Sequence, residues 1–409
     1  MARSASRETL SVEFWAQGLG PGRFHAFKQF VGLAGDEEES EDCLNLNVFA
    51  PEKAKNLPVF VWIYGGSSVE GHVGWDFYGP LDNIVRRHPC IVVAMNYRLG
   101  VLGYLALKEL SAVDPRKGSG NAGITDQQLA MRWVQENIHA FGGDPNRVTL
   151  IGQSSGGTSI WVQVSILGHL ASRSSRGLFH GAISLSASPN ITMDRAAKEA
   201  QDRALLLPHT PCAGMSESTL LECLYTADFG PFLHKNFDKA YGAEAVEKIR
   251  MFYDKYEPAQ YGVFALDSDT GLACALRRFA MAAREGFRSP VYWSTVTSMP
   301  NSTVALMWDL PFHNWDFMAA VKNWDTFGYT PKESDVAFGE RILGDWYQFL
   351  TQGNITDRGY APVQATKASE NVVGNDVGET KTSVRPNHKH DVCEFWESIG
   401  VDQRWWWIN

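Results

Sequence analysis

The stretch that decides the fold runs from Arg147 to Gly157 and reads RVTLIGQSSGG. An apolar, β-branched run passes directly into Gly152-Gln153-Ser154-Ser155-Gly156, and a helix-forming stretch, residues 158–167, follows. A serine between glycines at this spacing can occupy a sharp, strained turn, because side chains two positions away on either side would collide. Its hydroxyl then projects above the carboxyl end of the sheet, where open α/β sheets bind ligands. We therefore predict that Ser154 is a nucleophile.

Other apolar runs have the composition of strands. They are residues 57–64, 90–97, 181–186 and 291–296. Continuous rather than alternating apolar runs are typical of strands buried on both faces of a parallel sheet. A helix is expected to open at Thr125, with Gln128 at capping-box spacing, and another to span residues 240–255. This alternation of strands and helices predicts a doubly wound α/β sheet.

The helix that opens at Thr125 is expected to bury one apolar face. The apolar residues of that face recur at helical spacing: Leu129, Trp133, Val134 and Ile138. Residues 361–387 are polar and rich in Gly, Thr and Asn, which predicts a surface loop. Because the sequence shows no internal repeat and no clear boundary, we expect a single domain over residues 1–409.

Composition excludes several classes of function. The net charge is −9 and no block of Lys and Arg stands out, which argues against a nucleic-acid partner. No run of about 20 apolar residues occurs, so no membrane-spanning helix is expected. Residues 1–15 contain no apolar segment of the kind found in secretory signals, which predicts a cytosolic location. Six cysteines in 409 residues are too sparse for a disulfide framework.

A second glycine-rich turn lies upstream of Ser154. The run 57–64 ends in Gly65-Gly66-Ser67-Ser68, where small residues let the backbone approach a substrate. Acyl transfer needs backbone N–H groups directed at the developing oxyanion. We predict that the N–H groups of Gly66, Ser67 and Ser155 are these donors.

A series of motifs resembles the type-B carboxylesterase/lipase family, which includes the cholinesterases. The matching stretches, in chain order, are residues 41–48 (EDCLNLNV), 62–66 (WIYGG), 96–100 (NYRLG) and 120–145. They are followed by the serine turn at residues 152–156, which we call the elbow. The match is dense over residues 41–190 and thin elsewhere, and it is most similar to fungal members. The resemblance implies an α/β-hydrolase fold, with a central mixed, mostly parallel sheet flanked by helices. It also implies a Ser–acid–His triad, no metal and no organic cofactor.

The general base must be a histidine that follows the elbow in the chain. His313, in the stretch PFHNWDF, resembles the histidine loop of the family, and His388 and His390 are the alternatives. The acid is not assigned by the resemblance, because the interval between Cys223 and Cys274 is shorter than in the family and no matching Glu motif is found there. The chain is also shortened near its N-terminus.

Three explanations for the missing acid stay open. Another carboxylate can substitute, and Asp194, which follows the run 181–186, is the first candidate. The others are Asp267, Asp269 and Asp316. Alternatively, the gene model has lost an exon, or the site no longer hydrolyses, since a Ser–His pair without its carboxylate keeps only part of its catalytic power.

Further residues depart from the family pattern or take a role from it. Gln153 stands where the family often has Glu, and Ser155 and Ser67 stand where it often has Ala and Gly. Met193 occupies a position that shapes the acyl pocket in relatives, so it is a candidate for substrate binding. Cys212 with Cys223, and Cys274 with Cys393, match two disulfide pairs of the family, and Cys43 matches half of a third. Because no signal segment is seen, we expect reduced thiols.

The sequence therefore predicts a serine hydrolase acting on carboxylic esters of a small hydrophobic molecule, with a fungal secondary metabolite as one candidate. Two alternatives stay open. One is a non-hydrolytic catalyst, a cyclase or eliminase that uses the oxyanion donors. The other is a catalytically impaired binding protein.

Overall fold

The computed structural model describes residues 42–68, 70–104, 121–164, 175, 177–187, 243–253, 272–286, 289–300, 313–326, 328–364 and 372–399. Within these ranges a five-stranded sheet has the order β1-β3-β2-β4-β5. Its strands are β1 (Leu46–Phe49), β2 (Leu57–Ile63), β3 (Ile91–Met95), β4 (Gly143–Gln153) and β5 (Gly181–Leu185). β1 is antiparallel to β3 and every other pair is parallel, so the sheet is mixed and mostly parallel, as predicted.

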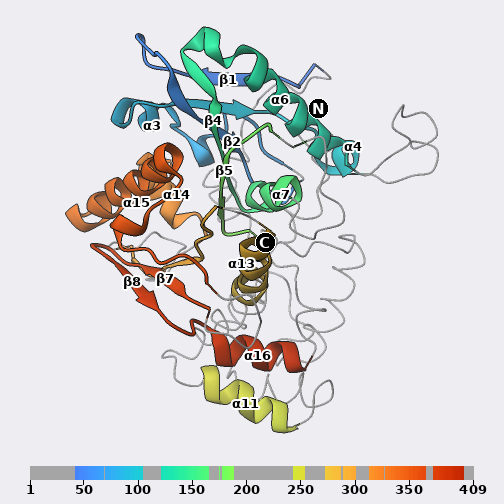
Figure 1. Cartoon of the computed structure of the whole chain (residues 1–409), viewed down its shortest axis with the longest axis vertical. Helices are drawn as coiled ribbons and strands as arrows, with labels where there is room; N and C mark the ends of the chain where they lie inside the picture. The colour runs from blue at the N-terminus through green and yellow to red at the C-terminus, as the bar shows by residue number, and fades with distance from the viewer. Residues whose placement is uncertain are drawn as a thin grey trace, which may run out of the picture.

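The sheet carries helices on both faces, which is why its central strands are apolar throughout (Figure 1). On one face lie α3 (Asp82–Arg87), α14 (Trp315–Val321) and α15 (Glu333–Gln352). On the other lie α6 (Ala122–Asn137) and α7 (Ser155–Val164). All five residues of β3 are buried, and six of the seven in β2 are buried. This two-sided burial confirms the interpretation of the continuous apolar runs.

Short helices complete this part of the chain. They are η2 (Asp76–Tyr78), α4 (Gly100–Tyr104), η3 (Ile138–Phe141) and η7 (Thr356–Arg358). Within the described ranges, no helix has both the length and the apolar character needed to cross a membrane.

Helix α6 differs from the expectation in its start and in its buried face. It begins at Ala122 rather than Thr125, and the Thr125 hydroxyl donates to the Ala122 carbonyl at 2.8 Å instead of capping the helix. Leu129 is 53% exposed, whereas Gln127 and Gln128 are buried. The predicted apolar face was therefore wrong in part. Buried amides replace it because α7 supplies hydrogen-bonding partners, Ser159 for Gln127 and Gln163 for Gln128.

A second sheet has the order β6-β7-β8, with β6 (Ser294–Val296) parallel to β7 (Gly374–Val377) and β7 antiparallel to β8 (Thr382–Arg385). The prediction of a polar loop over residues 361–387 was therefore wrong for this hairpin. Polar residues form a buried strand here because their side chains are paired. The Asn375 amide donates to the backbone carbonyls of Trp293 and Ala361, and Asp376 forms an ion pair with Arg385.

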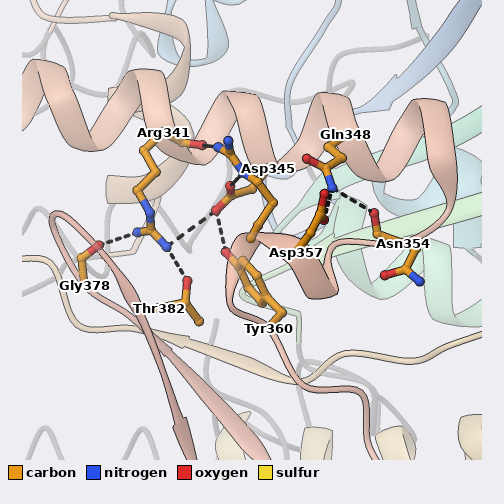
Figure 2. A network of polar contacts seen from close by, with 9 residues as sticks. Arg341, Asp345, Gln348, Asn354, Asp357, Tyr360, Gly378 and Thr382 are labelled. Carbon is orange, nitrogen blue, oxygen red and sulfur yellow. Dashed lines mark hydrogen bonds and ion pairs between the residues drawn. The ribbon is translucent and has the colours of Figure 1, made fainter.

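An ionic cluster joins α15 to this hairpin (Figure 2). The buried carboxylate of Asp345 accepts from Arg358 Nε at 2.6 Å and from the Tyr360 hydroxyl at 2.8 Å. Arg341, one turn earlier on α15, donates to the Gly378 carbonyl and to the Thr382 hydroxyl. The second sheet is thus attached to the helix that covers the first.

Three further helices are α11 (Ala243–Tyr253), α13 (Cys274–Gly286) and α16 (His390–Ser398). α16 contacts α11, where the Trp396 indole N–H donates to the Tyr253 hydroxyl at 3.0 Å. α11 confirms the helix expected over residues 240–255 within its described part. A disulfide joins Cys274 to Cys393, so the expectation of reduced thiols was wrong for this pair. Its two ends lie on neighbouring helices with Cα atoms 5.2 Å apart, which is within the reach of a disulfide. Cys43 is a buried free thiol, and Cys212 and Cys223 lie outside the described residues.

Candidate active site

Ser154 occupies the turn between the end of β4 and the start of α7. Its φ is 58°, in the left-handed region, which costs a non-glycine residue about 1–2 kcal/mol. Two hydrogen bonds hold the turn. The Ser154 N–H donates to the Leu185 carbonyl at the end of β5 at 2.9 Å, and the Ser154 carbonyl accepts from the Thr158 N–H at 2.9 Å. The strained strand–turn–helix geometry of a nucleophile elbow is therefore present.

The glycines around Ser154 are required by close backbone approach. A Cβ on Gly156 would lie 2.1 Å from the Ile63 carbonyl oxygen, and one on Gly152 would lie 2.8 Å from the backbone of Gly156. Atoms cannot approach so closely without a shift of the backbone. The predicted reason for the glycine spacing, collision across the turn, is thus confirmed.

The loop after β2 lies against this turn. A Cβ on Gly65 would lie 2.8 Å from Ser154 Cβ, so the two backbones are neighbours. The Ser68 N–H donates to Ser155 Oγ at 3.0 Å, which links the loop to the first residue of α7. Gly66 and Ser67 have φ values of 108° and 53°. The structure thus brings Gly66, Ser67 and Ser155 to one place, and their role as oxyanion donors stays a prediction.

His313 lies two residues before α14 and is connected to the elbow through Gln153. Gln153 Nε2 is 3.0 Å from His313 Nε2, and Gln153 Oε1 accepts from the Tyr78 hydroxyl at 2.6 Å. His313 is therefore held beside the residue that precedes the nucleophile. In the described part of the chain, however, no hydrogen bond joins Ser154 Oγ to His313.

The His313 ring faces the interior of a cavity. His313 is exposed to that cavity, and the protein around the cavity partly desolvates the ring. This desolvation lowers the pKa of His313 from 6.5 to about 4, and no charged group contributes to the shift. The imidazole is therefore neutral at pH 7, which is the form that a general base requires.

The acid is not found among the described residues. Asp316 is buried, and desolvation raises its pKa to about 6. Its Oδ1 accepts from the Phe317 N–H at 2.9 Å. No carboxylate in the described ranges forms a hydrogen bond with His313. Asp194, the first candidate, lies outside the described residues; so do Met193, Asp267 and Asp269.

The two alternative histidines are engaged in the C-terminal elements. His388 Nε2 is 3.0 Å from Thr295 Oγ1 and 3.9 Å from Asp376 Oδ1, within the second sheet. His390 Nδ1 is 3.0 Å from Arg277 NH2 on α13. These contacts involve the C-terminal elements, whereas His313, alone among these three histidines, has a hydrogen bond to an elbow residue.

Two residues of the site escaped the sequence analysis. Tyr78 comes from η2, a single turn with no motif around it, and its contact with Gln153 spans 75 positions of sequence. Ser68 belongs to the predicted oxyanion loop, but its backbone bond to Ser155 Oγ has no signal in the sequence. The serine at position 155, where the resemblance suggested Ala, was the one available hint.

A cavity of about 730 Å³ begins at His313 and extends along β5 and β6. Aromatic side chains line much of it, among them Trp161, Phe179, Tyr292, Trp315, Trp346 and Phe349. Its volume is within the range of small-molecule sites. In the described ranges, no group of three or more His, Cys, Asp or Glu side chains is arranged to hold a metal ion.

A mixed, mostly parallel sheet between two layers of helices, with a serine on a strained turn after a central strand, defines the α/β-hydrolase class. A solved structure titled "thermophylic PNB esterase" shares this fold. It has a TM-score of 0.63 and 22% identity, and the alignment covers 90% of this chain and 86% of that one. The sequence profile of the carboxylesterase family matches residues 20–247, more than half of the chain. The chain belongs to the carboxylesterase family.

Two relatives are acetylcholinesterases. That of Danio rerio is 40% identical over 192 residues, which is 45% of this chain and 28% of the relative. That of Gallus gallus is 40% identical over 204 residues, which is 48% of this chain and 25% of the relative. The matches thus span about a quarter of the length of these relatives.

Proposed function

We propose that the chain is a serine hydrolase that cleaves carboxylic esters of a small hydrophobic molecule. The observation that carries this proposal is the nucleophile elbow. Ser154 has a φ of 58°, and its backbone N–H and C=O form hydrogen bonds with β5 and α7. A strained turn of this kind persists only where the surrounding structure determines it, and such turns concentrate at functional sites.

The chemistry assigned to these residues is acyl transfer. Ser154 Oγ attacks the ester carbonyl carbon, while His313 Nε2 takes the hydroxyl proton. The backbone N–H groups of Gly66, Ser67 and Ser155 stabilise the oxyanion. His313 then returns the proton to the leaving alkoxide, which departs as the alcohol. A water molecule, deprotonated by His313, attacks the acyl-enzyme carbonyl. The bond to Ser154 Oγ then breaks, Ser154 regains the proton from His313, and the carboxylic acid is released.

The orienting carboxylate in this scheme is Asp194, which follows β5. The geometric requirement is a hydrogen bond to His313 Nδ1, because Nε2 contacts Gln153 and must take the Ser154 proton. An Asp194→Asn variant is therefore expected to lower kcat by about 10⁴-fold with little change in KM, as loss of a triad carboxylate does. An unchanged kcat would remove Asp194 from the scheme.

The cavity supports a hydrophobic substrate. Its aromatic lining favours apolar groups of the ester, and His313 is among the lining residues, whereas Ser154 is not. Met193, which lies outside the described residues, is proposed to contact the substrate, because a flexible thioether adapts to irregular shapes. An ester of a fungal secondary metabolite is one such substrate, suggested by the sequence resemblance alone.

A second candidate function is non-hydrolytic, either a cyclase or eliminase or a binding protein. The observation that favours it is that His313 Nε2 is occupied by Gln153, while no described carboxylate bonds to its ring. This candidate predicts that Ser154→Ala keeps full activity on the true substrate, or full affinity for it.

The test is turnover of p-nitrophenyl esters of increasing acyl length by purified protein, with Ser154→Ala and His313→Asn as variants. Hydrolysis that rises with acyl length and is lost in both variants supports the proposal. Turnover that survives Ser154→Ala would contradict it. Val162→Ala, on the same helix but 48% exposed and outside the scheme, is the matched control.

The location in the cell is a separate proposal. The sequence predicts the cytosol, whereas the Cys274–Cys393 disulfide favours an oxidising compartment. Thiol alkylation of the protein taken directly from its native source distinguishes the two. Protection of Cys274 and Cys393 supports the oxidising compartment, and their modification supports the cytosol.

A further inference from the structure

Gln153 lies between two partners, and its amide can be oriented from them. The distance from Tyr78 Oη to Gln153 Oε1 is 2.6 Å. This distance is typical of a hydrogen bond donated by an O–H group, and it is shorter than the usual donor–acceptor distance when an amide N–H donates. Burial raises the pKa of Tyr78 well above its usual value, so the hydroxyl keeps its proton, and a hydrogen bond from the Gly65 backbone occupies its oxygen. Tyr78 is therefore the donor, and Gln153 Oε1 is the acceptor.

This orientation decides the tautomer of His313. With Oε1 directed at Tyr78, the group directed at His313 is the amide nitrogen, which only donates. His313 Nε2, 3.0 Å away, must then accept, and the ring proton resides on Nδ1. A neutral imidazole has one lone pair, and in this arrangement Gln153 occupies it.

We propose that Gln153 is a positioning residue that competes with Ser154 for the single lone pair of His313 Nε2, so that the Gln153–His313 hydrogen bond must break before Ser154 can be deprotonated. This inference rests on the proposed hydrolase function, because it assumes that His313 is the base for Ser154. It adds a step to that function. In the resting site the Gln153–His313 hydrogen bond is formed, and this bond breaks when substrate approaches.

The Gln153–His313 hydrogen bond forms only with the neutral imidazole. Once His313 has taken the proton of Ser154, Nε2 carries hydrogen and faces the amide hydrogens of Gln153, two donors with no acceptor between them. The bond to Gln153 cannot persist in the imidazolium state. Gln153 therefore stabilises the resting base and disfavours its protonated form, in the same direction as the desolvation that lowers the pKa of His313.

Among the described residues, the titratable groups near His313 come from several elements. Tyr78 lies behind Gln153 on η2, and Asp316 belongs to α14, three positions along the chain. Asp345 of α15, Tyr360, Tyr292 and His180 line the same cavity. Neither carboxylate, Asp316 or Asp345, contributes to the lowered pKa of His313.

The variants separate competition from a merely structural role. Tyr78→Phe combined with Gln153→Leu removes both partners, so no buried hydroxyl is left without an acceptor. We expect a fluorophosphonate to label Ser154 in this double variant about tenfold faster than in the wild type at pH 7, the factor that one neutral hydrogen bond is worth. Gln153→Glu places a carboxylate against Nε2, so the pKa of His313 rises and the acid limb of labelling moves up by a unit or more.

The deciding experiment is nitrogen NMR of the full chain labelled with ¹⁵N-histidine, with His313→Asn used to assign the ring. The wild type is expected to show protonated Nδ1 and unprotonated Nε2, titrating below pH 5, and Gln153→Glu to titrate higher. A proton on Nε2 in the wild type, or slower labelling of the double variant, would overturn the inference. The NMR measurement does not depend on turnover. If the expected tautomer is present but no variant is labelled, the result counts against the hydrolase function alone.

Discussion

The two sheets are stabilised by different interactions. β2 and β3 of the five-stranded sheet are apolar and buried between helices, so burial of hydrocarbon holds them. β7 of the three-stranded sheet buries Asn375 and Asp376, whose side chains need specific partners. The nucleophile belongs to the first region. The cavity that begins at His313 extends between the two, along β5 and β6.

This difference in stabilisation predicts which substitutions each sheet tolerates. An apolar sheet loses stability in proportion to the area or volume removed, whereas a polar network fails when one partner is deleted and the others stay buried. Perturbations of the second region should therefore be large and local to named pairs. Perturbations of the first should act through close packing.

The largest expected effect is on the C-terminal helices. Replacing Cys274 and Cys393 by Ala opens a loop with a sequence separation of 119, which costs about 5 kcal/mol in the chain-entropy account. Urea denaturation of the oxidised protein and the variant measures it. Cys90→Ala is the matched control, since Cys90 is buried and free. A loss below about 1 kcal/mol would mean that non-covalent packing holds α13 and α16.

The next effect concerns the ionic cluster of Figure 2. Asp345→Ala leaves Arg358 and Tyr360 without their buried acceptor, and we expect a loss of about 4 kcal/mol in unfolding free energy. Asp357→Ala, which removes an exposed carboxylate bonded to Gln348, should change stability by less than about 0.5 kcal/mol. Equal effects of the two variants would contradict the account of the second sheet.

Gly156→Ala tests the packing of the first region. The added Cβ would lie 2.1 Å from the Ile63 carbonyl oxygen, so we expect a loss of about 3 kcal/mol and loss of serine labelling. Gly74→Ala is the control, because its Cβ would meet nothing nearer than 3.5 Å. Wild-type stability and labelling in Gly156→Ala would show that the elbow is looser than described.

The smallest expected effect depends on pH. The pKa of Asp316 is about 6 in the fold against 3.8 in the unfolded chain. The unfolded state therefore gains stability relative to the fold as pH rises from about 4 to 6, and the difference is constant above that. Asp316→Asn removes this cost and should raise the unfolding free energy by at most about 3 kcal/mol at pH 8. The gain should vanish below pH 4, and a gain that is independent of pH would contradict the assignment.

The same contrast explains what could be predicted from the sequence. The apolar runs predicted β2, β3 and β5 to within a few residues, because two-sided burial leaves a continuous signal. They predicted β4 only in part, since its first residues are polar. β7 reads Gly-Asn-Asp-Val and carries no strand signal, because its stability depends on partners far away in the chain.

The site follows the same division. Ser154 was predictable because the elbow is local, with its glycines within two residues. His313 was found through the family resemblance, and the structure connects it to the elbow by way of Gln153. The Tyr78–Gln153 contact was not predictable, since it joins a three-residue turn to a strand end 75 positions later. The sequence marked Gln153 as a departure from the family but gave no reason for it.

The central claim is that the elbow of the first region makes Ser154 a nucleophile with His313 as its base. A fluorophosphonate, followed by intact mass and peptide mapping, tests it most directly. We predict one adduct per chain, on the peptide that contains Ser154, absent in Ser154→Ala and formed at least about a hundredfold more slowly in His313→Asn. An adduct at any other residue, or none on folded wild-type protein, would contradict the account.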